Sequence, residues 1–114
     1  MREELRDIER LQHIAEAVND ILEFTEEKTF EEFIQNKILK HAVYRNFAVI
    51  GEAANLLTKE YKETHPIVEW HRIIGMRHLL VHGYYQADDV VVWQTITEDL
   101  PKLHEIIVAL LNFD

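Results

Sequence analysis

Apolar residues recur at steps of three and four along most of the chain, which is the period of an α-helix. The first such stretch runs from about Arg2 to Thr25, and charged residues occupy its other side. Its apolar positions are Leu5, Ile8, Leu11, Ile14, Ala15, Val18, Ile21 and Leu22. This pattern predicts one long amphipathic helix that buries one face.

A second helical region begins after the short charged turn that follows residue 25. Thr29 belongs to a residue type that favours the N-cap of a helix, and two glutamates place negative charge in the turn after it. Helical spacing then continues from Phe33 to about Tyr61, with no proline to interrupt it. We therefore expect a short helix that runs into a long one, with a break near Asn36.

The chain beyond this region is divided by its two prolines and by Gly83. Residues 62–65 are expected to connect two helices. Pro66 is expected at the first position of the second of these helices, because proline is tolerated there. That helix should run to about His82, where Gly83 allows it to stop.

The last region is predicted to be helical, although part of it would suit a strand. Residues 90–93 are rich in β-branched side chains, but no partner strand is predicted, so a helix capped by Asp88 or Asp89 is favoured. Pro101 must kink this helix or start a new one. A final apolar stripe follows at Leu103, Ile106, Ile107, Leu110 and Leu111. The whole pattern predicts an all-α, antiparallel up-and-down bundle of four to six helices, in a single domain of residues 1–114.

Composition limits the classes of function. The chain has 114 residues with 3 glycines, 2 prolines and no cysteine. These counts suit one domain of long helices and exclude a disulfide framework or a thiolate metal site. No apolar run is long enough to span a bilayer and the N-terminus does not resemble a signal peptide, so we expect a cytoplasmic protein.

The formal net charge is −9. Such an acidic chain lacks the broad basic surface with which proteins coat nucleic acids. Chemistry on RNA would therefore have to depend on a local cationic pocket. The acidic surface, including that of the first helix, would suit a protein partner with a basic surface.

One short stretch, between Gly75 and Tyr85, brings together three chemically capable side chains. Arg77 is followed by His82 five residues later and by Tyr84 two residues after that. Cleavage of RNA by its own 2′-hydroxyl needs a base that works near neutral pH, which suits histidine. It also needs a fixed cation on the phosphate, which suits arginine. Each residue has an ordinary structural explanation as well: a solvated arginine, a histidine at a helix end and a packed tyrosine.

The spacing of this motif favours an assembly of two chains. On one straight helix Arg77 and His82 would stand about 140° apart, so the two side chains would not share a face. A site that uses both is easiest to build across a two-fold axis, where two copies contribute their groups. We therefore expect a homodimer in which both copies of the pair line one cleft.

The pattern Arg77-x4-His82-x-Tyr84 resembles the motif of the HepT-like toxins in the HEPN superfamily. Further blocks similar to those of the family occur in the same order along nearly the whole chain, at residues 7–14, 42–54, 70–77 and 92–101. The resemblance implies a bundle-forming homodimer that cuts RNA as an endoribonuclease without a metal or another cofactor. It gives Arg77 and His82 the catalytic roles.

The same resemblance implies a protein partner and a modification. HepT-like toxins pair with a minimal nucleotidyltransferase antitoxin, MntA-like, which transfers AMP from ATP to the motif tyrosine and silences the toxin. By position that acceptor is Tyr84, and Tyr85 stands beside it. The chain departs from the family pattern at His78, where another polar residue, often asparagine, usually stands.

Four other residues are candidates for support of the pocket. Glu52 stands among small and apolar residues, so a cationic partner is expected. The resulting ion pair would be purely structural, or Glu52 would use it to orient Arg77 or Arg45 near the site. Arg45 and Asn46 suit either the pocket or the dimer contact, and His78 is expected to support the pocket or to bond to Glu52.

A zinc site built from His71, His78 and His82 is disfavoured, because no well-spaced acidic or cysteine ligand stands beside them. Trp70 and Trp93 are expected to anchor the core or an interface. Two functional hypotheses follow from the sequence. One is an RNase toxin that its antitoxin silences, and the other is a non-catalytic helical dimer that serves as a binding module for a nucleotidyltransferase or a nucleotide.

Overall fold

A computed structural model describes the backbone of residues 2–81 and 86–113 and the side chains of residues 6–75 and 89–112. Every regular element in this part of the chain is helical, so the predicted all-α class is confirmed. The α-helices are α1 (Arg2–Thr25), α2 (Phe30–Gln35), α3 (Lys37–Leu56), α4 (Lys59–Thr64), α5 (Trp70–Val81), α6 (Gln86–Gln94) and α7 (Leu100–Phe113). A π-helical turn, Thr95–Asp99, joins α6 to α7.

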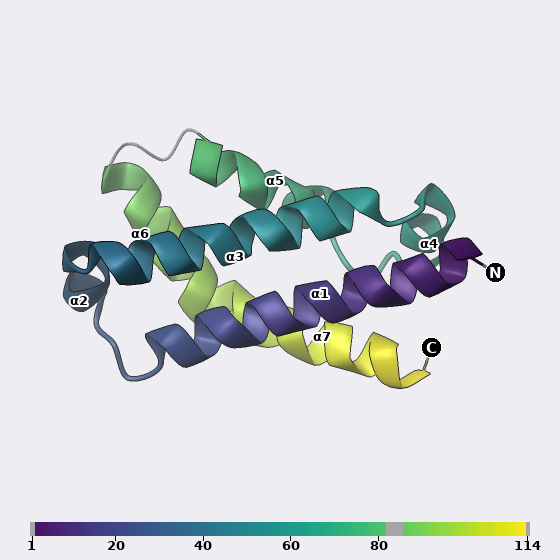
Figure 1. Ribbon diagram of the computed structural model, residues 1–114, viewed down its shortest axis with the longest axis horizontal. Coiled ribbons are helices and arrows are strands. Elements are labelled where there is room, and N and C mark those ends of the chain that lie inside the picture. The colour runs from purple at the N-terminus through teal and green to yellow at the C-terminus, as the bar shows by residue number, and fades with distance from the viewer. Residues whose placement is uncertain (1, 82–85, 114) are drawn as a thin grey trace.

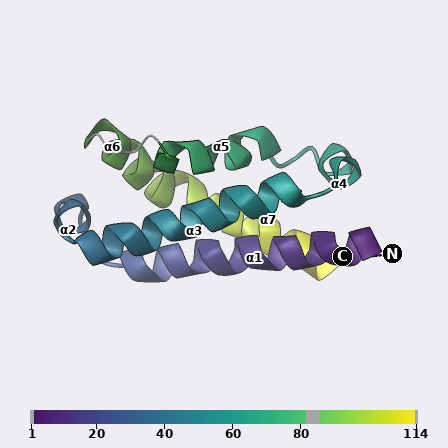
Figure 2. The ribbon, with the colours of Figure 1, turned by 45° about the horizontal axis from the view of Figure 1, so that its top comes forward.

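The long helices form an elongated bundle of 45 × 26 × 21 Å. Helix α3 runs antiparallel to α1, and α5 returns along the other side of α3 (Figure 1). Helix α7 packs against α1, and α6 crosses from the far end of α5 down to α7, as Figure 2 also shows. Helix α7 also approaches α5, because residues of both line one hollow and Arg72 of α5 pairs with Asp99 just before α7. The long helices therefore close into a bundle, and the predicted antiparallel bundle is confirmed.

Helix α1 begins and ends as its pattern predicts. Leu11, Ile14, Val18 and Ile21 are fully buried at helical spacing and face the other long helices. They belong to one apolar cluster of the described residues, which also includes Phe47, Ile50 and Ile107. Burial of each such side chain contributes about 1.5–3 kcal/mol, so this stripe is the main reason why α1 is stable.

The start of α2 and the break before α3 are also as predicted. The Thr29 hydroxyl accepts a hydrogen bond from the Glu32 N–H at 3.1 Å, and the Glu32 carboxylate accepts one from the Thr29 N–H at 3.0 Å. This pair is a capping box. Asn36 ends α2 and then caps α3, because its side-chain oxygen accepts a hydrogen bond from the Leu39 N–H at 3.0 Å.

The prediction that the long helix continues to about Tyr61 is wrong. Helix α3 ends at Leu56, and Thr58 caps a separate short helix, α4, which occupies most of the expected connector. The reason is a contact from α1. The buried carboxylate of Asp7 accepts hydrogen bonds from the Thr58 N–H at 2.9 Å and from its hydroxyl at 2.7 Å, which holds Thr58 in an extended conformation.

The predicted start of the next helix at Pro66 is wrong as well. Helix α5 begins at Trp70, and Pro66 lies in the turn before it. The indole N–H of Trp70 donates to the His65 carbonyl at 3.0 Å, and the Tyr61 and His65 rings stack at 4.0 Å between centroids. These contacts fold the turn against the core, where Trp70 is buried, so its predicted role as a core anchor is confirmed.

The region 90–93 is helical, as predicted, but the expected cap is not there. Helix α6 begins at Gln86, so Asp88 and Asp89 lie inside it. Pro101 is the second residue of α7 and follows the π-helical turn, in which the Leu100 N–H donates to the Thr95 carbonyl. Proline has no N–H and its ring collides with the preceding turn, which explains the wider turn here. The expected stop at Gly83 falls outside the described residues.

Candidate functional site

The motif residues are described only in part. The backbones of Arg77 and His78 lie in the last two turns of α5. Their side chains, and the whole of His82, Tyr84 and Tyr85, fall outside the described residues. The expected meeting of Arg77, His82 and Tyr84 therefore stays a prediction, and so does the bond between His78 and Glu52.

The surroundings of the motif are described. Helix α5 runs antiparallel to α3, and its end lies over the first half of α3 in both ribbon views (Figures 1 and 2). Helix α6 begins at the same end of the bundle (Figure 1). The side chains on the first half of α3 are thus the described neighbours of the motif region.

A polar cluster links this part of α3 to α6. The carboxylate of Asp89 forms an ion pair with the Lys40 ammonium at 2.8 Å and accepts a hydrogen bond from the Tyr44 hydroxyl. The Asp89 side chain is only 9% exposed and that of Lys40 is 23% exposed. A buried carboxylate is costly unless it is paired, so these two donors make the position of α6 on α3 specific.

Sequence reasoning missed this cluster, because it considered Asp89 only as a helix cap. One indication was available: Lys40 and Tyr44 stand four residues apart and therefore share one face of a helix. Both side chains donate hydrogen bonds to the Asp89 carboxylate. An acid placed 45 residues or more beyond them cannot be assigned to that face from spacing alone.

The predicted supporting residues differ in their surroundings. Arg45 is exposed, and Asn46 is half-buried with its amide donating to the Ala42 carbonyl of its own helix at 2.9 Å. Glu52 is exposed, so its carboxylate is not buried among the small and apolar residues beside it in the sequence, and its expected cationic partner stays a prediction. Its neighbours Gly51 and Ala53 are buried, but the helical turn directs position 52 outward. Glu52 is nevertheless not without a partner.

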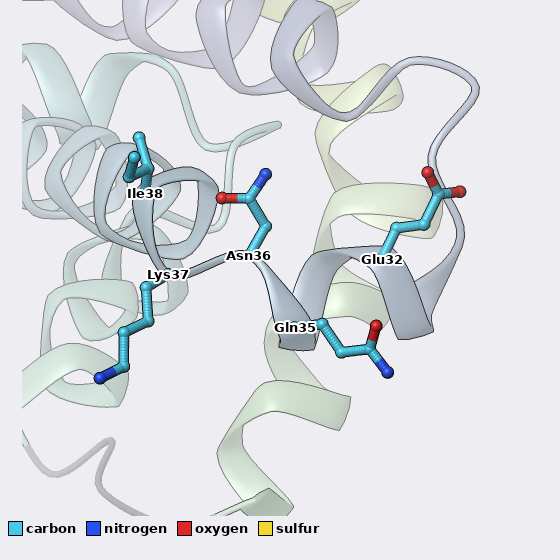
Figure 3. Close-up of a pocket in the computed structure, with 5 residues that line it drawn as sticks. All are labelled: Glu32, Gln35, Asn36, Lys37 and Ile38. Carbon is cyan, nitrogen blue, oxygen red and sulfur yellow. The ribbon is translucent and has the colours of Figure 1, made fainter.

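A shallow hollow lies where α2 meets α3. It has a volume of about 520 Å³ and is lined by Glu32, Gln35, Asn36, Lys37 and Ile38. In Figure 3 the Lys37 ammonium extends to the opposite side from the Glu32 carboxylate. The hollow therefore combines one carboxylate, two carboxamides, one cation and one apolar side chain where α2 meets α3.

Among the described side chains, no group of three or more His, Cys, Asp or Glu residues is placed to hold a metal ion. His71 of the disfavoured zinc site is exposed on α5. Trp93 packs on the Phe33 ring at 5.2 Å between centroids, in agreement with its predicted anchoring role. None of the helices in the described ranges is both long and apolar enough to cross a membrane.

Comparison with known proteins places these features in a family. Residues 14–110 match the family model described as "Ribonuclease HepT-like". A protein of Methanocaldococcus jannaschii named as a candidate RNase is 37% identical over 99 residues, which cover 86% of this chain and 91% of that protein. No solved structure matches the chain.

Two further relatives come from other organisms. A protein of Thermococcus cleftensis named as a candidate ribonuclease HepT is 41% identical over 93 residues, which cover 82% of this chain and 84% of that protein. One of Caldanaerobacter subterraneus named as a candidate RNase is 34% identical over 102 residues, which cover 90% of this chain and 91% of that protein. The similarity in each case extends over most of both chains.

Proposed function

Because the chain belongs to the ribonuclease HepT-like family, we propose that it is a metal-independent endoribonuclease that acts through Arg77 and His82. The single observation that carries this proposal is the family match over residues 14–110, which includes the whole Arg77-x4-His82-x-Tyr84 motif. The relatives named as candidate RNases or ribonuclease HepT support the same reaction class.

In the proposed reaction His82 takes the proton of a ribose 2′-hydroxyl, and the 2′ oxygen attacks the adjacent phosphorus. The bond from phosphorus to the 5′ oxygen of the next nucleotide breaks, and that oxygen is protonated. The products are a 2′,3′-cyclic phosphate and a free 5′-hydroxyl. Arg77 binds the phosphate, whose negative charge increases in the transition state, and the planar guanidinium suits that role.

The proposed active form is a homodimer in which the two copies of Arg77 and His82 share one cleft. The support for this form is the spacing of the motif, because on one straight helix Arg77 and His82 would stand about 140° apart. Light scattering at micromolar protein should report a dimer. A monomer that cleaves RNA at full rate would contradict the shared cleft.

The proposed role in the cell is that of a toxin with an MntA-like nucleotidyltransferase antitoxin as its partner. We propose that this partner transfers AMP from ATP to the Tyr84 hydroxyl, with pyrophosphate as the leaving group. The added phosphodiester would place a negative charge near Arg77 and compete with the RNA phosphate, and the adenosine would obstruct the cleft.

Cleavage of RNA by the purified protein tests the activity. We expect cleavage in the presence of EDTA, with products that carry a 2′,3′-cyclic phosphate. If EDTA abolishes the reaction, or if the products carry a 5′-phosphate, the proposed mechanism is wrong.

Substitution of the acceptor tests the proposed silencing. Tyr84→Phe should cleave RNA and stay active after incubation with ATP and the nucleotidyltransferase, whereas the wild-type protein should gain the mass of AMP and lose activity. Tyr85→Phe is the matched control, and it should still be silenced. AMP found on Tyr85 or Tyr44 would contradict the assignment to Tyr84.

A further inference from the structure

Three basic side chains follow one line on the outward face of α3. Lys37, His41 and Arg45 stand four residues apart, so they extend over about 12 Å on one side of the helix. All three are exposed. We call them the α3 basic stripe.

No described carboxylate neutralises the stripe. Lys40, on the adjacent face, is paired with Asp89, but Lys37 and Arg45 form no ion pair with any side chain in residues 6–75 or 89–112. Residues 33–51 contain no Asp or Glu at all. In a chain with a net charge of −9, the stripe is therefore a local region of opposite sign.

The stripe lies next to the motif region. The end of α5 lies over the first half of α3 (Figures 1 and 2), and Lys40 and Tyr44 of that half are bonded to α6 through Asp89. His41 follows Lys40 and Arg45 follows Tyr44, so each stands about 100° around α3 from the residue that bonds to Asp89. Lys37, seven residues before Tyr44, stands only about 20° from it. The polar cluster thus fixes the orientation of the stripe relative to both helices that flank the motif.

The surface at the beginning of the stripe suits a nucleotide. Gln35, Lys37 and Ile38 line the hollow between α2 and α3 together with Glu32 and Asn36. In Figure 3 the Ile38 and Lys37 side chains point in opposite directions from the beginning of α3, and Gln35 extends from the end of α2. Ile38 is 84% exposed. A carboxamide can bond to the edge of a base, as occurs in proteins that bind single-stranded RNA, and the exposed apolar surface of Ile38 can cover part of a base.

We propose that the α3 basic stripe binds the phosphates of a single-stranded RNA next to the position where it is cleaved. This inference rests on the proposed RNase function and names where its substrate binds. An acidic protein repels RNA as a whole, so RNA can approach only through a local cationic surface. The stripe is such a surface, and the spacing of its groups lets it contact successive phosphates of one strand.

The test measures the binding of a short, fluorescent, single-stranded 2′-O-methyl RNA to the full-length protein. The methyl group blocks the attacking 2′ oxygen, so binding is observed without cleavage. The test variant is Lys37→Gln with Arg45→Gln. The matched control is Lys102→Gln with Arg6→Gln, which removes two exposed cations from α7 and α1.

Loss of the stripe should weaken RNA binding roughly tenfold, the scale of two exposed charge contacts, and the control should change it less than about twofold. The slope of log affinity against log salt should fall by about 0.7 for each lost phosphate contact. With cleavable RNA, the KM should rise and kcat should stay near the wild-type value. Arg45→Lys, which keeps the charge, should retain most of the affinity.

Three results would overturn the inference. Equal affinity of the test and control variants would exclude the stripe as the RNA site, and RNA cleavage by the wild-type protein would still support the proposed function. A change in oligomeric state that accounts for the loss of binding would assign the stripe to a contact with a second copy. Absence of any RNA binding by the wild-type protein would overturn the inference, whereas binding without cleavage would support the stripe and remove the RNase function.

Discussion

Helices α1 and α3 pack against each other with the same kind of apolar face, but their outward faces differ in charge. The outward side of α1 exposes Glu9, Glu16 and Glu23, whereas that of α3 exposes Lys37, His41 and Arg45. The inward faces are determined by the shared core, which both helices must fill. The outward faces carry no such constraint, so their charges can differ without a change in the core.

This difference shows why the net charge is a poor guide to what this chain binds. The negative net charge of −9 agrees with the acidic outward face of α1, but it does not agree with the basic first half of α3. At physiological salt, charges are screened beyond about 8 Å, so a short cationic line can act locally on an acidic protein. We expect RNA to approach from the α3 side and a basic protein partner to approach from the α1 side.

The largest effect is expected when the proposed general base is removed and the proposed RNA-binding surface is left intact. His82→Ala should reduce the rate of RNA cleavage by about 10²-fold or more, the usual loss when a general base is removed. Its affinity for 2′-O-methyl RNA should stay near that of the wild-type protein, because the α3 basic stripe is intact. His71→Ala is the control, since His71 is an exposed histidine of α5 that lies outside the motif. Normal cleavage by His82→Ala would exclude His82 as the base.

A smaller effect is expected when the partly buried ion pair between Lys40 and Asp89 is broken. Asp89→Asn leaves Lys40 without its anion and should lower the free energy of unfolding by about 1–3 kcal/mol. Asp99→Asn is the control, because Asp99 forms an exposed pair with Arg72 at 3.4 Å and should contribute less than about 1 kcal/mol. Urea denaturation measures both. Equal losses would show that the Asp89 cluster does not hold α6 on α3.

The smallest effect is expected on α1. Glu9→Gln with Glu16→Gln removes two negative charges from the outward face of α1, and RNA affinity should change less than about threefold. The measurement is the same fluorescence titration. A gain in affinity as large as the loss caused by Lys37→Gln with Arg45→Gln would mean that RNA senses the total charge, and the contrast between the two helices would have no functional meaning.

Features that depend on neighbouring residues could be predicted from the sequence. The bounds of α1, the cap at Thr29 and the break at Asn36 follow from periodicity and from side chains that bond three residues away. The resemblance to the HepT-like family rests on a local motif and on blocks in the family order. It was confirmed by the match over residues 14–110.

Features that depend on distant residues could not be predicted. Helix α3 ends at Leu56 because Thr58 donates hydrogen bonds to the Asp7 carboxylate, and Asp7 lies 51 residues earlier in the chain. Thr58 is of a residue type that favours the N-cap of a new helix, and its hydroxyl accepts a hydrogen bond from the Tyr61 N–H. The contact with Asp7, however, cannot be read from residues near Leu56. In the same way Asp89 was interpreted as a cap, because its partners on α3 precede it by 45 and 49 residues. The supposed enclosure of Glu52 failed for another reason: small apolar neighbours along the chain do not surround a side chain that points outward from a helix.

The most direct test of the account is to locate the bound RNA on the protein by NMR. In a titration of isotope-labelled protein with single-stranded 2′-O-methyl RNA, the largest shifts should occur at Lys37, His41 and Arg45 of α3. Glu9, Glu16 and Glu23 of α1 should stay nearly unchanged. Shifts concentrated on α1, or spread evenly over both helices, would contradict the claim that RNA binds on the α3 side.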